Sequence, residues 1–340
     1  MKIGIVDNPY SMGHLWIDYC EQKGIPYKRI NCYESNVVAQ VSDCDAFMWH
    51  YHHAHSKDVL FAKELLYSLE TAGKSVYPNF RTSWHFDDKL GQKYLLESLN
   101  LPIVPTYAFY SKKDAFDWLE KKSFPIVFKL RGGAGSSNVR IIRNKKHAKR
   151  IVKTAFGRGF SQNNKWLGIK ERIRKFRNKQ DSLFNVVKGI IRFAYLTKFE
   201  KVAGRAKGYV YFQDFVSGND SDTRVIVIAG KAFAIKRLVR EDDFRASGSG
   251  HIVYEKSQID ENLVKLAFQI TDKLGNQCSA IDFIYDNGEP KLVEVSFGFT
   301  PEAYGKCPGY WDKDMNWFEG KFNPYGWMVE EVLKPVNSYA

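Results

Sequence analysis

The first eighty residues alternate short apolar runs with stretches of helical periodicity, and this alternation constrains the fold more than any other feature of the sequence. Strands are predicted at residues 3–6, 27–30, 46–49 and 75–77, with helices at 14–23, 35–41 and 59–71 between them. A β-α-β-α order forms a parallel sheet with crossover helices. Ligands of such sheets bind beyond the carboxyl ends of the strands. The sequence therefore predicts a parallel α/β domain with a functional edge.

Four of the eight histidines follow the third predicted strand in the run WHYHHAHS at residues 49–56. They belong to a loop at the functional edge, and His85 follows the next strand. Three interpretations stay open: the loop faces a substrate, it is a solvated or structural polar loop, or it binds a transition metal through His50, His52 and a third histidine. The substrate-facing interpretation selects His52, His53, His55 and His85.

A lysine precedes a glycine-rich segment in FPIVFKLRGGAGSSNVRII at residues 124–142, which is predicted to form strand, loop and strand. Glycines let backbone N–H groups approach phosphate oxygens, and Lys129 adds a point charge. The segment does not follow the P-loop pattern, because no Gly-Lys-Ser/Thr ends it and no helix follows. A tight hairpin that needs glycine only for its turn is the alternative.

Two carboxylates lie on neighbouring predicted strands near the C-terminus. Asp282 lies in SAIDFIYD and Glu294 in KLVEVS, with Asp286-Asn287-Gly288 as the hairpin turn between them. Ser296 shares a strand face with Glu294. Paired carboxylates repel each other unless a cation lies between them, and oxygen ligands suit Mg²⁺. Acidic residues on a solvent-facing strand are the alternative.

Cations recur along the strands between these two motifs, at Arg224, Lys236, Arg237 and Arg245. A cation inside an otherwise apolar sheet is costly unless it meets an anion. Phosphate or carboxylate substrates would supply that anion. Surface ion pairs within the protein are the alternative.

The order of these features resembles the ATP-grasp superfamily, and most closely the RimK-like glutamate ligases. The shared pattern is a lysine at a helix start, Lys89, then a lysine before a glycine-rich loop, QDFV, DTR, a spaced FR and Asp…Glu-x-Ser. It covers residues 80–300. The resemblance implies a mixed α/β (α+β) ATP-grasp fold. Its parts would be an N-terminal α/β domain at 1–80, a subdomain at 81–208 with the glycine-rich loop, and a subdomain at 209–340 with the metal-binding strands and an aromatic tail.

The resemblance also implies roles for individual residues. Arg224, Arg237 and Arg245 would steady the substrate carboxylate and the transferring phosphoryl group, and Asp282, Glu294 and Ser296 would hold two Mg²⁺ ions, for which Mn²⁺ can substitute. Two serines depart from the family pattern, because asparagine is common at the positions of Ser296 and Ser247. The residues implied to bind ATP are Lys89, Lys129, Gly132, Gly133, Gly135, Ser136, Ser137, Asp214, Phe215, Val216 and Asp220.

The implied reaction is ligation of a carboxylate to an amine or amino acid through an acyl phosphate. Stretches such as WHFDDK and CPGYWDKDMNW also resemble ATP-grasp proteins of bacterial surface-polysaccharide loci. We therefore expect the acceptor to be a uronic-acid carboxylate on a lipid- or nucleotide-linked glycan. Ligation on a small molecule or protein tail, and a non-catalytic nucleotide- or glycan-binding protein on the same scaffold, are the alternatives.

A basic insert accounts for most of the net charge of +13, because residues 158–208 contain fourteen Lys or Arg against three acidic residues. Its apolar residues interleave with the cations, and four interpretations of segment 165–195 stay open. It contacts an anionic membrane surface, binds an anionic polymer such as a glycan, forms a solvated surface excursion, or packs as a helical hairpin on the core. Nucleic acid is disfavoured, because no motif for base recognition is present.

Five scattered cysteines and the lack of a long apolar run favour a cytoplasmic protein, peripheral to the inner face of the membrane in the first of these interpretations. The oligomeric state is not predicted.

Overall fold

The computed structural model describes residues 1–9, 11–132, 138–162, 182, 198–239, 246 and 250–334. Several predicted functional positions lie outside these residues. They are Gly133, Gly135, Ser136 and Ser137 of the glycine-rich loop, Arg245, Ser247, and all of segment 165–195 except Ser182. Within the described ranges no helix is both long enough and apolar enough to cross a bilayer.

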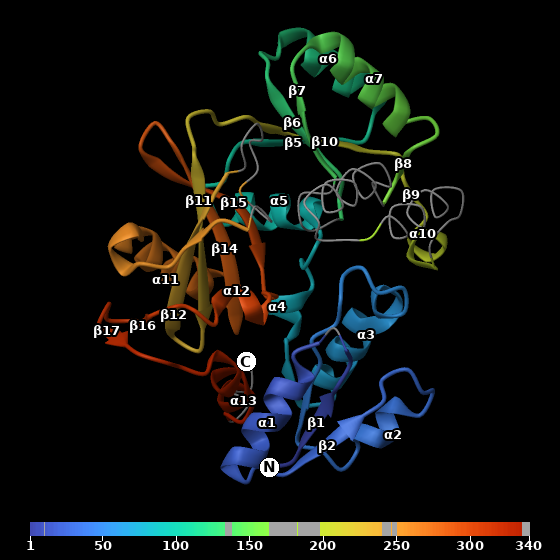
Figure 1. The fold of residues 1–340 in the computed structure, drawn as a ribbon. Helices are drawn as coiled ribbons and strands as arrows, with labels where there is room; N and C mark the ends of the chain where they lie inside the picture. Colours follow the sequence, from blue (N-terminus) through green and yellow to red (C-terminus); the bar gives the residue numbers. More distant parts are fainter. Residues whose placement is uncertain are drawn as a thin grey trace.

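The N-terminal part is the predicted parallel sheet, with strand order β2-β1-β3-β4 (Figure 1). This confirms the β-α-β-α prediction, and the strand ends differ from it by one residue at most. The strands are β1 (Ile3–Val6), β2 (Tyr27–Ile30), β3 (Ala46–Met48) and β4 (Ser75–Tyr77), and the helices are α1 (Gly13–Lys23), α2 (Val37–Val41) and α3 (Asp58–Thr71).

A small antiparallel sheet with order β5-β10-β6-β7 lies at the opposite end of the molecule, covered by helices α6 and α7 (Figure 1). Strand β6 leads into the glycine-rich loop and β7 leaves it, as predicted. Strand β10 follows the predicted boundary at residue 208 but pairs with β5 and β6, so this sheet extends to Asp214. The elements are β5 (Thr106–Phe109), α6 (Lys112–Lys121), β6 (Ile126–Lys129), β7 (Val139–Ile142), α7 (Lys145–Ala155) and β10 (Val210–Asp214).

The large sheet is antiparallel, with order β15-β14-β11-β12-β16-β17, and β13 pairs with β12. At the predicted hairpin between β14 and β15, Asn287 and Gly288 both have positive φ, 52° and 84°, which a tight hairpin turn requires. The elements are β11 (Ser221–Ile228), β12 (Lys231–Leu238), β13 (Ile252–Val253), α11 (Glu261–Leu274), β14 (Cys278–Asp286), β15 (Glu289–Ser296), α12 (Pro301–Tyr304), β16 (Gly309–Asp312) and β17 (Trp317–Glu319).

Short elements connect these sheets. Helix α5 joins the N-terminal part to the small sheet, and residues 102–104 after it pair with Leu292 of β15. The connecting elements are α4 (Phe80–Ser83), α5 (Lys89–Ser98), β8 (Phe160–Ser161), α10 (Lys198–Ala203), β9 (Arg205–Ala206) and the 3₁₀ turn η1 (Lys256–Gln258).

The C-terminal helix α13 (Pro324–Val332) packs against α1, far from it in sequence (Figure 1). The Trp16 indole donates a hydrogen bond to the Met328 sulfur at 3.3 Å, and Tyr19 donates to Glu330 at 2.5 Å. One hydrophobic core therefore joins the N-terminal sheet, one face of the large sheet and α13.

Met328→Ala tests this shared core. Met328 is fully buried, so the variant should lose about 2–5 kcal/mol of unfolding free energy, measured by urea titration. Lys321→Ala, at an exposed position in the same tail, should change stability by less than about 0.5 kcal/mol. Equal stability of Met328→Ala and wild type would contradict the role given to α13.

Candidate active site

The first turn of α5 fixes Lys89 against the glycine-rich segment. Asp88 caps the helix by accepting a hydrogen bond from the Gly91 N–H at 3.0 Å, and its carboxylate also binds the Arg131 guanidinium at 2.9 and 2.5 Å. The Lys89 N–H donates to the Arg131 carbonyl at 2.8 Å. The start of α5 and the end of β6 are thus held together.

Gln92 fixes the other side of α5 to β15. Its side chain donates to the Val295 carbonyl at 2.7 Å and accepts from the Val295 N–H at 3.3 Å. This bond holds α5 beside β15, where the Lys89 ammonium lies 3.5 Å from a carboxylate oxygen of Glu294.

A narrow slot runs between the small and large sheets, with Lys89 and Lys129 among its lining residues. Leu96, Ile103 and Leu292 give it apolar walls, and the buried side chain of Gln213 supplies an amide. The slot is only about 20 Å³ and would have to widen to hold a base. Its apolar walls and amides would then suit a flat ring, and its two ammonium groups would suit phosphates. The remaining lining residues are Gln92, Lys93, Thr106, Tyr211 and Val293.

Lys129 is buried, and no described residue forms a hydrogen bond with its ammonium group. Burial lowers the pKa of Lys129 to about 8, with nearby Lys89 acting in the same direction and Glu294 opposing it. For Lys89, burial also acts to lower the pKa, but Glu294 and Asp87 outweigh it and the pKa is raised. Lys129 is therefore a buried cation that an anionic ligand would stabilise.

Three adjacent strands bring Arg224, Asp282 and Glu294 into one row, because Asp282 pairs with Arg224 on β11 and with Glu294 on β15. The Arg224 guanidinium makes a two-point contact with Asp282, and Arg237 reaches the same carboxylate at 3.0 Å. Burial alone would raise the pKa of Asp282, but the two arginines lower it to about 2.

Arg237 also binds Asp222 through two hydrogen bonds of 2.6 and 2.7 Å. Arg224 and Arg237, two of the three arginines predicted to bind substrate, are thus held by aspartates of the protein in largely buried ion pairs rather than the surface ion pairs of the alternative. Their predicted contacts with substrate stay predictions.

The structure brings two of the three predicted metal ligands together. The side chains of Asp282 and Glu294 lie opposite each other, whereas the Ser296 hydroxyl is engaged with Gly298, donating to its carbonyl at 3.2 Å and accepting from its N–H at 3.0 Å. No group of three or more His, Cys, Asp or Glu side chains suited to a metal is found among the described residues, the histidine loop included. The carboxylate pair would therefore need ligands from outside these side chains.

The first two residues of the predicted hinge QDFV point their side chains in different directions. Gln213 faces the slot, while Asp214, one residue on, forms an ion pair with Lys122 at 2.5 Å and accepts from Tyr107 at 3.2 Å. Side chains alternate along a strand, so only the backbone of Asp214 can reach the slot. Gln213 is a site residue that sequence reasoning missed.

The other predicted hinge residues follow β10. Phe215 and Val216 are partly exposed, and Asp220 is exposed at the start of β11 with its carboxylate bound by Ser221. Their contacts with adenine and ribose stay predictions.

The histidine loop divides into different environments. His50 is buried, which lowers its pKa to about 4. His55 lies 2.5 Å from the Asp58 carboxylate, which also accepts from the His52 N–H at 2.8 Å, so these contacts order the loop. His53 reaches a cavity, and burial lowers its pKa.

The prediction that His85 faces a substrate is wrong. His85 is 1% exposed and stacks edge-on against Trp84. It belongs to the interior behind α5, because the chain turns inward between α4 and α5.

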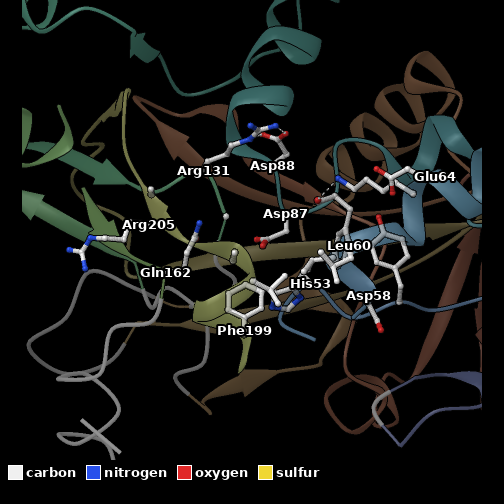
Figure 2. Close-up of a pocket in the computed structure, with 18 of the residues that line it drawn as sticks. His53, Asp58, Leu60, Glu64, Asp87, Asp88, Arg131, Gln162, Phe199 and Arg205 are labelled. Carbon is white, nitrogen blue, oxygen red and sulfur yellow. Dashed lines mark hydrogen bonds and ion pairs between the residues drawn. The ribbon is translucent and has the colours of Figure 1, made fainter. Parts of the chain in front are cut away.

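A cavity of about 520 Å³ separates α3 from α10 and adjoins the start of the glycine-rich loop (Figure 2). Its walls include His53 of the histidine loop, Asp87 and Asp88 before α5, and Arg131 and Gly132 after β6. A second ligand there would lie next to the Lys89 end of the slot.

Residues 195–303 match the RimK-like ATP-grasp domain. The alpha-aminoadipate–LysW ligase LysX of Saccharolobus solfataricus is 23% identical over 234 residues, which is 69% of each chain. Among solved structures, the RimK domain ATP-grasp protein of Sphaerobacter thermophilus superposes with a TM-score of 0.59 at 15% identity, covering 98% of this chain and 100% of that one. D-alanine–D-alanine ligase of Bacillus anthracis, in complex with ATP, superposes at 0.57 and 15% identity, covering 98% and 96%.

These matches confirm the expected fold and the resemblance to RimK-like proteins. The chain has an ATP-grasp fold, and its residues 195–303 are similar to the RimK-like ATP-grasp domain.

The affinity for ATP should depend on pH through Lys129. Its pKa is about 8 without ligand, and bound phosphate would raise it, so ATP binding should take up a proton between about pH 8 and 10 and weaken as pH rises through that range. Calorimetry in buffers of different ionisation enthalpy measures this uptake. Lys129→Met should abolish it; an unchanged uptake would show that another group is responsible.

Asp282→Asn should lower the unfolding free energy at pH 7 by about 3–5 kcal/mol, because two buried arginines lose their shared carboxylate. The folded pKa of Asp282 lies below its unfolded value of about 4, so its contribution is complete above pH 4 and is lost as pH falls through about 2. Urea titrations from pH 7 to 3 should therefore show a difference in unfolding free energy between wild type and Asp282→Asn that starts to decrease only below pH 4. Glu289→Gln, at an exposed end of β15, is the control.

Proposed function

We propose that the protein activates a carboxylate with MgATP as an acyl phosphate and transfers the acyl group to an amine. One observation carries this proposal: Lys129, a buried lysine without a hydrogen-bond partner among the described residues, lies with Lys89 at the slot, near the carboxylates of Glu294 and Asp282. Apolar walls and two ammonium groups match a nucleotide in polarity and in charge, and the two sheets would have to separate to admit it, because the slot is only about 20 Å³.

Lys89 and Lys129 would bind the phosphates, and Gln213 would bind the base. Lys129 gains most from this, because its charge is the less compensated of the two. Glu294 lies close enough to Lys89, at 3.5 Å, to hold that ammonium in place before nucleotide binds. The predicted roles of the glycine-rich loop, Asp214, Phe215, Val216 and Asp220 complete the proposed nucleotide site.

Mg²⁺ would be held by Glu294 and Asp282, with Ser296 as the third protein ligand proposed. Glu294 keeps 27% of its side chain exposed and bonds to no arginine among the described residues. Arg224 and Arg237 occupy three of the roughly four hydrogen-bond acceptor positions of the Asp282 carboxylate. One acceptor position, on Oδ1, is left for a metal ion. A bound ion would neutralise phosphate charge. Two ions, and Mn²⁺ as a substitute, remain part of the proposal.

The residues of this chain would position and neutralise rather than form covalent bonds to substrate. The substrate carboxylate attacks the γ-phosphorus and ADP leaves. The amine nitrogen then forms the C–N bond to the carbonyl carbon as the C–O bond to phosphate breaks. Arg224 and Arg237 would act mainly by fixing Asp282, to which both are bonded.

The identity of the substrates rests on the sequence. The name of LysX describes a ligase of alpha-aminoadipate and LysW, which is consistent with an amino acid as one substrate here. A uronic-acid glycan as the carboxylate, and contact of segment 165–195 with an anionic membrane, stay predictions from sequence alone.

Calorimetric titration of ATP with and without Mg²⁺ tests the nucleotide site. Lys129→Ala should weaken Mg²⁺-dependent binding by about 10- to 150-fold, because it removes a hydrogen bond to a charged group worth about 1.5–3 kcal/mol. Lys113→Ala removes a lysine of α6 whose side chain is 84% exposed and pairs only with exposed Asp117, and it should leave the affinity unchanged. A folded wild-type protein that binds no nucleotide would refute the proposal.

A further inference from the structure

We infer that Gln92 is a positioning residue for the metal ion, because it fixes a β-bulge in β15 that turns the Glu294 carboxylate out of the hydrophobic core and toward Lys89. This inference rests on the proposed function, in which Glu294 binds Mg²⁺. It identifies the side chain on which the geometry of that metal site depends.

Strand β15 carries one residue more than its partner β14 beside the proposed metal site. Glu294 pairs with Asp282 and Leu292 pairs with Phe283, so Val293 between them has no partner on β14. An extra residue of this kind is a β-bulge. Bulges are common at sheet edges and next to active sites, where they re-aim side chains.

The bulge determines the direction of the Glu294 side chain. In a regular strand, residues two apart share a face, so Glu294 would face the core together with Leu292. Here Leu292 and Val295, three apart, belong to the same hydrophobic core and are 1% and 0% exposed. Glu294 is thereby turned to the other face, where its carboxylate lies 3.5 Å from the Lys89 ammonium.

The bulge is held at both ends from the open side of β15, which is the edge strand of the large sheet. Before the bulge, the Leu292 N–H donates to the Pro102 carbonyl at 2.8 Å, and its carbonyl accepts from the Val104 N–H at 3.0 Å. After the bulge, the Gln92 side chain donates to the Val295 carbonyl at 2.7 Å and accepts from the Val295 N–H at 3.3 Å. One side chain therefore replaces a pairing strand at this position.

Gln92 is itself fixed. It is 4% exposed, and its amide also donates to the His85 carbonyl at 3.1 Å. Without it, the buried N–H and carbonyl of Val295 would lose their partner, which is costly enough for the strand to shift. Because Val295 lies between Glu294 and Ser296, such a shift would move both proposed metal ligands of β15.

Gln92→Met tests this role, because methionine is close to glutamine in length but cannot donate a hydrogen bond and accepts one only weakly. Calorimetry measures the ADP affinity of the full-length protein with excess Mg²⁺ and with EDTA, and the ratio of the two gives the enhancement by the metal. Gln92→Met should reduce this enhancement by about tenfold or more, as loss of a residue that orients a metal ligand does. The affinity in EDTA should stay within about threefold of wild type. An unchanged enhancement in the folded variant would overturn the inference.

Gln277→Met is the matched control. Gln277 also joins two segments through its side chain, accepting from the Asn79 N–H at 2.8 Å and donating to the Val76 carbonyl at 3.0 Å. The substitution should lower stability and leave the Mg²⁺ enhancement unchanged. If both variants lose the enhancement equally, the effect is one of stability and the inference is wrong.

A double-mutant cycle shows whether Gln92 acts through Glu294. Glu294→Gln should itself reduce the Mg²⁺ enhancement. Adding Gln92→Met to Glu294→Gln should then reduce it by less than about twofold more, because the two residues act on one ligand. Effects that multiply as independent ones would contradict the inference.

Thermodynamic linkage provides a measurement that does not depend on the folding of any variant. If the contact between Gln92 and Val295 favours Mg²⁺ binding, Mg²⁺ must stabilise that contact to the same extent. In wild-type protein saturated with ADP, addition of Mg²⁺ should slow amide hydrogen exchange at Val295 by about tenfold. Exchange at Asn79, whose N–H is bonded to Gln277, should not change. Unchanged exchange at Val295 would overturn the inference.

Failure of the proposed function would give a different result. A folded wild-type protein that binds no ADP would refute the nucleotide site. Wild-type protein that binds ADP equally with and without Mg²⁺ would refute the metal site. Loss of the inference alone leaves the Mg²⁺ enhancement of the wild-type protein intact.

Discussion

The site depends on one buried charge, the ammonium group of Lys129. A cation removed from water without a hydrogen-bonded anion is costly, and no described residue bonds to it. Its pKa falls to about 8 for this reason, whereas the pKa of Lys89, which has Glu294 beside it, is raised. The imbalance favours an anionic ligand at the slot, and in the proposed function this ligand is a nucleotide whose ring lies against the apolar walls.

The rest of the molecule holds this charge in place. Gln92 fixes α5 to β15, Asp88 and Arg131 fix α5 to the end of β6, and the Arg224–Asp282–Arg237 cluster fixes the carboxylates on the large sheet. Groups from both sheets therefore meet at the slot.

Local features could be predicted from the sequence, because near neighbours determine them. Strand and helix order and the Asn287-Gly288 turn follow from residues within a few positions. The pairing of Asp282 with Glu294 also followed from a short hairpin. Contacts between distant segments could not be predicted. The packing of α13 on α1, the place of β10 in the small sheet and the burial of His85 depend on how whole sheets meet. The sequence does not show which face of β10 meets the slot, so it could not single out Gln213 rather than Asp214. In the structure, the ion pair of Asp214 with Lys122 shows that the Asp214 side chain faces away from the slot.

The most direct measurement is an experimental structure of the protein with MgADP. The account predicts that the β-phosphate lies within hydrogen-bond distance, about 3 Å, of the Lys129 ammonium, and that the adenine lies between Leu292 and the small sheet beside Gln213. A nucleotide bound elsewhere, or phosphates directed away from Lys129, would contradict it.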